Sequence, residues 1–315
     1  MRFMNKDETR KILDRDLIDV AKIWQHQLRL EYMNPKRNVR VSFSDLGPCG
    51  ELLAISYNMG YTGSGSGGMG LDLVNRNKSK SVEVKSCCTI QSSKCTEETC
   101  GAKFSPLFHA KCPICGALGK TMTDSRFSIN SKEFLEQYNK GFFDNFTLCH
   151  VYQIGHDEEK KSLAVAMDWY RIDFKDKDTR EIKLEYFRRQ AEDGSKPTCN
   201  LLPRSYDFFK LCPVLLDTIH IDINYRCMLN APKIRHLPIE LIREATKVRE
   251  GGLRLSDPEK EMFRSLETYD AESGEVDMKD FALNMPYRKK SHGKERGDTR
   301  KGAYRAAGLI SNSLE

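Results

Sequence analysis

Two short segments that alternate apolar and polar residues constrain the fold of this chain most strongly. Their sequences are Gly-Leu-Asp-Leu-Val at 70–74 and Ser-Val-Glu-Val-Lys-Ser at 81–86. A period of two predicts β-strands, and the polar run between the segments predicts a tight turn. Because neighbouring side chains of a strand point to opposite faces, Glu83 and Lys85 should lie on the same face. A hairpin would also bring Asp72 close to both side chains.

Two carboxylates and an amine in one small volume have a definite chemical use. Converging acidic side chains form a site for a hard divalent cation such as Mg²⁺. The cation can lower the pKa of a bound water and bind a phosphodiester oxygen, while the amine can orient the attacking water or stabilise the transition state. Because short motifs also occur by chance, the alternative interpretation is an exposed hairpin with ordinary surface charge.

The order Asp72, then Glu83-Val84-Lys85, resembles the PD-(D/E)xK nuclease signature, with Leu71 in place of the proline. Glu51 lies where this family often has another glutamate, on a helix before the first strand. The resemblance implies a nuclease core of the α/β class, in which a mixed sheet is flanked by helices. It also implies hydrolysis of DNA with Mg²⁺ as the catalytic cofactor.

The resemblance extends beyond the signature and implies a role for each residue. The Ser- and Gly-rich run at 62–70 is similar to the family, and the similarity is close over 44–90 and loose as far as residue 175. Lys85 would act on the attacking water. The implied Mg²⁺ ligands are Glu51, Asp72, Glu83 and the carbonyl of Val84.

The composition indicates a globular protein that is not embedded in a membrane. The chain has 315 residues, enough for one large domain or two ordinary ones, and 39% of them are apolar. Its N-terminus lacks the apolar stretch of a signal peptide, and no run is long enough to span a bilayer. We therefore expect a cytoplasmic protein of a bacterial or archaeal cell.

The cysteines form a second strong feature of the sequence. Six of the eleven fall between Cys87 and Cys115, a concentration that in a cytoplasmic chain indicates metal binding rather than disulfides. Two local pairs suit tetrahedral Zn²⁺ in a structural site, which would lie in a ribbon inserted at about 87–120. The alternatives are Cys87 or Cys88 in place of Cys95, His109 as a substitute ligand, or scattered reduced cysteines. The predicted ligands are Cys95, Cys100, Cys112 and Cys115.

Periodicity predicts the remaining elements of the first domain, residues 1–250. Helices are expected at 7–32, from a cap at Ser44 or Asp45 to about 58, at 132–140 with Ser131 as cap, and at 238–245. Further strands are expected at 126–129, 146–154, 162–170 and 215–223. Residues 175–230 otherwise show no clear pattern. We interpret His150 and His156 as structural residues.

The C-terminal region, residues 251–315, predicts a small helical DNA-binding domain after Gly251-Gly252. Ser256, Pro258 and Glu259 are typical of a helix start, and 276–283 predicts a second short helix. Residues 286–305 hold eight basic and two acidic residues, an excess that equals the net charge of +6 of the whole chain. A helix-turn-helix ending in a helix at about 300–309 would suit DNA. The predicted DNA contacts are Arg288, Lys289, Lys290, Lys294, Arg296, Arg300, Lys301 and Arg305.

Together these features predict a type II restriction endonuclease that cuts double-stranded DNA at a specific sequence. A homodimer is expected if the site is palindromic, because two-fold DNA is read by a two-fold protein. Two alternatives stay open. One is a repair or recombination nuclease that reads DNA structure. The other is a zinc-ribbon DNA-binding protein without catalytic activity.

Overall fold

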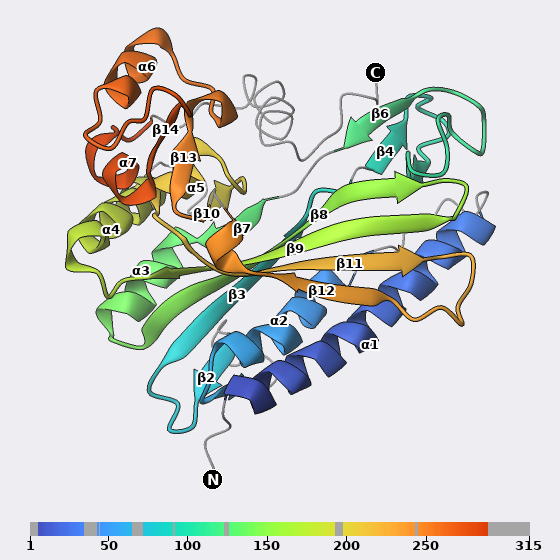
Figure 1. Ribbon diagram of the computed structural model, residues 1–315, viewed down its shortest axis with the longest axis horizontal. Coiled ribbons are helices and arrows are strands. Elements are labelled where there is room, and N and C mark those ends of the chain that lie inside the picture. Colours follow the sequence, from blue (N-terminus) through green and yellow to red (C-terminus); the bar gives the residue numbers. More distant parts are fainter. Residues whose placement is uncertain are drawn as a thin grey trace.

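The computed structural model describes residues 6–34, 43, 45–64, 72–90, 92–122, 126–192, 198–242 and 245–288. These residues form a mixed α/β fold around a curled seven-stranded sheet (Figure 1). In spatial order the strands are β1 (Tyr61–Gly63), β2 (Leu73–Asn75), β3 (Ser81–Cys88), β8 (Phe143–Asp157), β9 (Ser162–Asp173), β11 (Val214–Asn224) and β12 (Lys233–Leu237). β3 and β8 run parallel, and the other neighbours are antiparallel. The mixed sheet agrees with the expected fold class.

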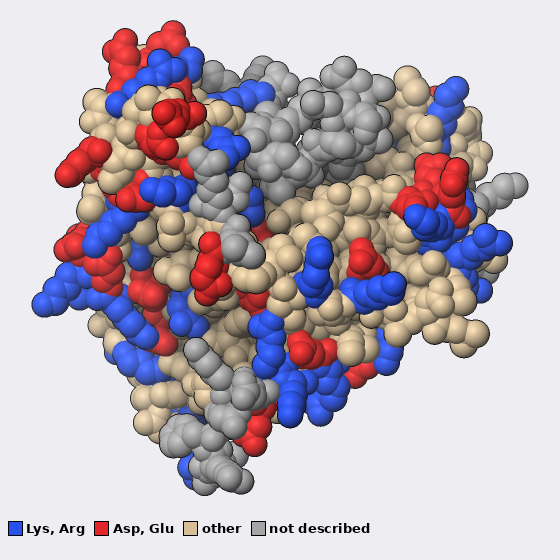
Figure 2. Space-filling model, in the orientation of Figure 1, with Lys and Arg blue, Asp and Glu red and all other residues tan. Residues whose placement is uncertain are grey.

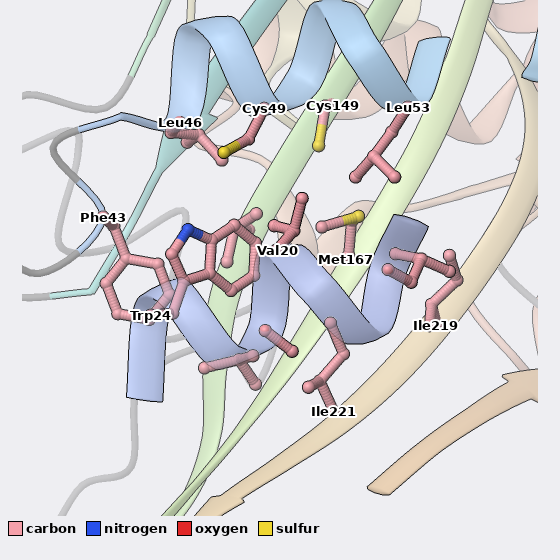
Figure 3. Close-up of a cluster of buried hydrophobic side chains, with 14 of the residues drawn as sticks. Val20, Trp24, Phe43, Leu46, Cys49, Leu53, Cys149, Met167, Ile219 and Ile221 are labelled. Carbon is pink, nitrogen blue, oxygen red and sulfur yellow. The ribbon is translucent and has the colours of Figure 1, made fainter. Parts of the chain in front are cut away.

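Two helices, α1 (Lys6–Met33) and α2 (Leu46–Tyr57), cover one face of the sheet (Figure 1). Apolar residues of α1 recur every three or four positions, so they form one stripe that packs into the core. Figure 3 shows Val20 and Trp24 of this stripe beside Leu53 of α2 and Met167 and Ile221 of the sheet. Both predicted helices are confirmed.

The cap expected at the start of α2 differs in detail. Asp45 precedes the helix, but its side chain caps no backbone N–H. Its carboxylate instead accepts a hydrogen bond from Gln27 Nε2 of α1 at 2.9 Å. The residue therefore joins two helices rather than stabilising one helix end.

The second core lies on the opposite face of the sheet, and half of its buried residues are aromatic, among them Phe134, Phe146 and Phe187. Its elements are α3 (Ser131–Asn139), α4 (Lys177–Glu192) and a small sheet of β7 (Phe127–Asn130) and β10 (Thr198–Leu201). α4 and β10 were not predicted.

The strand expected at 126–129 is present as β7, but it lies outside the main sheet. It pairs with β10, because Phe127 and Ile129 are buried in the second core together with Cys199 and Leu201 of that strand. The cap of α3 also differs from the prediction. Asn130 Oδ1, not Ser131, accepts a hydrogen bond from the Glu133 N–H at 3.2 Å.

A third core joins elements that we call the C-terminal unit. These are α5 (Tyr206–Lys210), β13 (Lys247–Arg249), η4 (Glu250–Gly252), α6 (Asp257–Arg264), β14 (Glu275–Asp277) and α7 (Met278–Asn284). The capping box of Ser256 and Glu259 confirms the predicted start of α6. The helix expected at 238–245 is wrong, since the described residues there form no α-helix; Ile239–Leu241 form a 3₁₀ turn, η2, which contacts β11. β13 pairs with β14 across the expected boundary at Gly251 and Gly252.

A small ribbon is inserted between β3 and β7, where the sequence predicts one. Its three strands are β4 (Ser92–Cys95), β5 (Lys103–Phe104) and β6 (Gly119–Met122). The ring of Phe108 fixes the ribbon to the end of the main sheet, with centroid distances of 5.2 Å to Tyr225 and 5.9 Å to Tyr32. In the part of the chain that the structure describes, no helix has the length and apolar character needed to cross a membrane.

Candidate catalytic and metal-binding sites

The hairpin of β2 and β3 brings Asp72, Glu83 and Lys85 together. Leu73 pairs with Val82, so Asp72 lies just beyond the paired residues, beside the middle of β3. Asp72 Oδ2 accepts a hydrogen bond from the Val84 N–H at 2.7 Å and lies 3.8 Å from Lys85 Nζ. Lys85 Nζ also contacts Glu83 Oε1. The predicted juxtaposition of two carboxylates and an amine is therefore present.

Alternation along β3 explains why these side chains meet. Val82 and Val84 point into the first core, so Glu83 and Lys85 point to the other face. The side chains of Glu83, Asp72 and Lys85 are 16, 19 and 28% exposed. They are thus removed from most solvent but remain reachable from outside.

Partial burial changes the proton affinity of the site. Burial raises the pKa of Glu83 to about 7; Lys85 opposes this shift, whereas Asp72 and Glu133 add to it. Burial also raises the pKa of Asp72, against the opposing effects of Lys85 and the Val84 N–H. For Lys85, burial disfavours the ammonium, but Glu83 and Asp72 outweigh it and raise the pKa. A cation placed among the carboxylates would therefore stabilise their charged forms.

Glu51 approaches the same site from α2. Burial and then the Asp72 carboxylate raise the pKa of Glu51, while Lys85 opposes the shift, so the three charges interact. α2 lies very close to β3 beside this residue. A Cβ added to Gly50 would lie 2.0 Å from Ser86 Oγ, so a larger residue fits there only if the Ser86 side chain moves. This close contact is what carries Glu51 toward the hairpin.

Val84 contributes its backbone to the edge of β3 that faces Asp72. Its N–H is bonded to Asp72, and the N–H and carbonyl of one strand residue lie on the same edge. The Val84 carbonyl therefore lies on the side of the carboxylates, as its implied role requires.

A pocket beside Glu83 contains polar residues that the sequence analysis missed. Its polar lining is Glu83, Asn130, Glu133 and Gln137, and its apolar lining includes Phe134 and Phe146. Glu133 lies in the first turn of α3 and adds negative charge next to Glu83. The only sequence signal for it was an acid in the first turn of a predicted helix. Its proximity to Glu83 depends on how α3 packs.

The four predicted cysteines of the ribbon form a compact cluster that can hold a metal ion. The sulfur atoms of Cys95, Cys100, Cys112 and Cys115 all lie within 4.8 Å of one another. Two of the distances are 3.4 Å, between Cys95 and Cys115, and 3.8 Å, between Cys100 and Cys112. A tetrahedral ion with metal–sulfur bonds of about 2.3 Å needs sulfurs roughly 3.8 Å apart.

Tight turns after each cysteine pair orient backbone N–H groups toward the sulfurs. Gly101 and Gly116 follow Cys100 and Cys115 and have φ angles of +57° and +76°, which favour glycine. Burial disfavours the Cys112 thiolate, but the N–H groups of Cys115 and Ile114 outweigh it and lower the pKa to about 7. The N–H groups thus favour the deprotonated form of this sulfur, which is the form that a metal requires, whereas burial raises the pKa of Cys95 to about 12.

The alternative ligands do not belong to this cluster. Cys87 is buried in the second core, and Cys88 packs against the first. His109 also lies outside the group of possible ligands found among the described residues. His150 is fully buried beside Thr89 Oγ1, and His156 is bonded to the Tyr225 hydroxyl at 2.8 Å, as structural histidines would be.

Of the predicted DNA-contacting residues, only Arg288 is described. It forms an ion pair with Glu259 at 2.7 Å and lies 3.9 Å from the ring centroid of Tyr206. Its guanidinium is thus engaged within the C-terminal unit. The other seven residues and the helix expected at 300–309 lie outside the described residues.

Comparison with known proteins identifies no relative of this chain: no family of proteins, no curated protein and no solved structure matches it.

Proposed function

We propose that this protein is a metal-dependent endonuclease that cuts double-stranded DNA, with the specificity of a type II restriction enzyme. The observation that carries the proposal is the convergence of Asp72, Glu83 and Lys85 on one hairpin, with Glu51 interacting from α2. A solvated surface hairpin would not need partly buried carboxylates around one lysine.

The donor set suits Mg²⁺, a hard cation that prefers carboxylate and carbonyl oxygens. Asp72, Glu83 and Glu51 would hold it, with the Val84 carbonyl as a further ligand. When bound, Mg²⁺ supplies a water of lowered pKa and polarises a phosphodiester oxygen. The raised pKa of Glu83 and Asp72 supports the fit, because clustered, partly buried carboxylates are stabilised by a cation.

Each protein group would then have a separate task. Lys85 would orient the attacking water and stabilise the negative charge that grows on the phosphate oxygens. Water attacks phosphorus, and the bond to the 3′ oxygen breaks. The Val84 N–H fixes the Asp72 carboxylate through their hydrogen bond, so that its orientation does not depend on the ligand.

We also propose that the cysteine cluster binds structural Zn²⁺. Four cysteine ligands leave no open position for a substrate, which argues against a catalytic ion. This cluster also supports the main competing function, a zinc-ribbon DNA-binding protein without catalysis. In that case the carboxylate hairpin would be unrelated to activity.

Digestion of methylated and unmethylated phage DNA with Mg²⁺ tests the proposal. Discrete bands from the wild type, and a rate lowered about 10²-fold or more in Lys85→Ala, are expected because one charge-stabilising group is removed. Lys161→Ala is the matched control, since that lysine lies in the turn between β8 and β9.

Other outcomes separate the alternatives. A smear in place of bands would favour a nuclease that reads DNA structure. DNA binding without cleavage would overturn the enzymatic proposal and favour the zinc-ribbon DNA-binding protein.

A further inference from the structure

The turn between β2 and β3, which we call the basic turn, has an unusual charge. Its residues 75–80 read Asn-Arg-Asn-Lys-Ser-Lys, with three basic residues and no acid. The turn between β8 and β9, at 157–161, reads Asp-Glu-Glu-Lys-Lys, with three acids and two basic residues. Figure 2 shows one face of the molecule, on which the described basic and acidic side chains are interspersed. A turn with one sign of charge is therefore distinctive.

Hydrogen bonds hold the basic turn in one conformation. The Asn75 N–H donates to the Lys80 carbonyl at 3.0 Å, and the Asn75 side chain accepts from the Lys80 N–H at 3.0 Å. Asn77 Oδ1 accepts from the Ser79 hydroxyl at 2.7 Å. The polar residues of the turn are used to fix its backbone, so its basic side chains extend from a defined support.

None of the three charges has an acidic partner in the part of the chain that the structure describes. Arg76 and Lys78 are exposed, and neither forms an ion pair with a described residue. Lys80 Nζ donates to the Gly141 carbonyl at 2.7 Å, which leaves its charge uncompensated. Lys78 has a φ of +56°, a conformation that favours glycine. Glycine would suit this backbone conformation better, so the conformation of the turn does not explain the lysine.

The basic turn lies next to the carboxylates. Lys80 directly precedes β3 and lies three positions before Glu83, which is about 10 Å at the usual rise of a strand. That length corresponds to about three base pairs measured along the axis of B-DNA. The half-exposed Phe142, 43% exposed, adjoins the turn, because its carbonyl accepts from the Ser81 N–H.

We infer that the basic turn binds the phosphates of DNA and holds the backbone against the carboxylates of the hairpin. This inference rests on the proposed nuclease function and names the contact that function needs. Glu51, Asp72, Glu83 and Glu133 repel a polyanion, and the basic turn offsets that repulsion beside the point of attack. The same two strands would thus provide both the metal ligands and the phosphate contacts.

The double variant Arg76→Ala/Lys78→Gly tests this interaction. Binding of a fluorescein-labelled duplex is measured by anisotropy at several salt concentrations, without added Mg²⁺. The dependence of log K on log salt should weaken by about 0.9 for each phosphate that the variant no longer neutralises. With Mg²⁺, KM for cleavage should rise while kcat changes little. The melting temperature should not fall, because glycine suits the positive φ of Lys78.

The matched control is Lys160→Ala/Lys161→Gly in the turn between β8 and β9, where Lys161 also has a positive φ, of +53°. β3 and β8 are parallel, so this turn lies at the opposite end of the sheet. An equal loss of binding in the control, or unchanged salt dependence in the basic-turn variant, would overturn the inference. If the wild type does not cut DNA but the basic-turn variant binds it less well, the nuclease proposal fails and the phosphate-binding role of the turn stands.

Discussion

At the scale of single residues, the candidate site depends on the distance between α2 and β3. Gly50 sets that distance, because its missing side chain leaves room for Ser86. Glu51 follows directly and interacts with Asp72 and Lys85. A residue with no chemistry of its own therefore positions one of the four charged groups.

We predict that Gly50→Ala lowers both stability and cleavage. The new Cβ would lie 2.0 Å from Ser86 Oγ and 3.2 Å from its Cβ, so the Ser86 hydroxyl must rotate away and the two backbones must separate slightly. Overpacking of this kind typically costs about 1–3 kcal/mol, measured here by urea unfolding. Adding Ser86→Gly should restore much of both properties, because it removes the two clashing atoms. A Gly50→Ala protein that unfolds and cuts like the wild type would contradict the argument.

At the scale of elements, the ribbon lacks a hydrophobic core large enough to stabilise it. Its buried cluster contains Cys95, Ala102, Phe104 and Cys112, of which two are candidate metal ligands. Elements this small need a metal or cross-links to fold. The metal would therefore also support the docking of Phe108 on the main sheet.

We predict one Zn²⁺ per chain, absent from Cys112→Ser and retained in Cys88→Ser. Elemental analysis of the purified proteins measures the stoichiometry. Hydrogen exchange should then show reduced protection over residues 92–122 in Cys112→Ser, with the main sheet unchanged, since the ribbon's fold depends on the ion. Retention of the ion in Cys112→Ser, or its absence from Cys88→Ser, would mean that the ligand set is wrong.

At the scale of the whole molecule, a buried polar network joins the middle strands of the main sheet. Asp168 is fully buried and accepts hydrogen bonds from Thr218 Oγ1 and Arg204, each at 2.8 Å. His150 pairs with Asp168 in the strand register. Burial lowers the pKa of His150 to about 3; Asp168 opposes the shift and Arg204 adds to it.

This histidine should make global stability fall in mild acid. The unfolded chain takes up a proton on His150 near pH 6.5, whereas the folded protein keeps it neutral to about pH 3. Protonation therefore favours unfolding as pH falls below 6.5, by up to about 1.4 kcal/mol per pH unit. Between pH 6.5 and 4.5 the wild type should lose about 2 kcal/mol more than His150→Gln in urea unfolding. Parallel pH profiles for the two proteins would contradict this.

Local elements with a regular pattern could be predicted from the amino-acid order alone. The alternation in β3, the stripe of α1 and the paired cysteines were readable because each depends on residues close together in the chain. The same reasoning predicted Asp72 beside Glu83 and Lys85, since a hairpin needs only one turn. It failed for α4, because one of the buried positions of that helix is Lys183, which interrupts the apolar pattern in the sequence. In the folded protein this lysine donates a hydrogen bond to the Asp173 carbonyl.

The meeting of distant segments, in contrast, became visible only in the folded molecule. β7 pairs outside the main sheet, with β10, a strand that comes from much later in the chain. Glu133 came close to Glu83, and Gly50 to Ser86, through the packing of helices on the two faces of the sheet. Local periodicity reports which side of an element is apolar. It does not report which other element covers that side, because many pairings bury a similar apolar area.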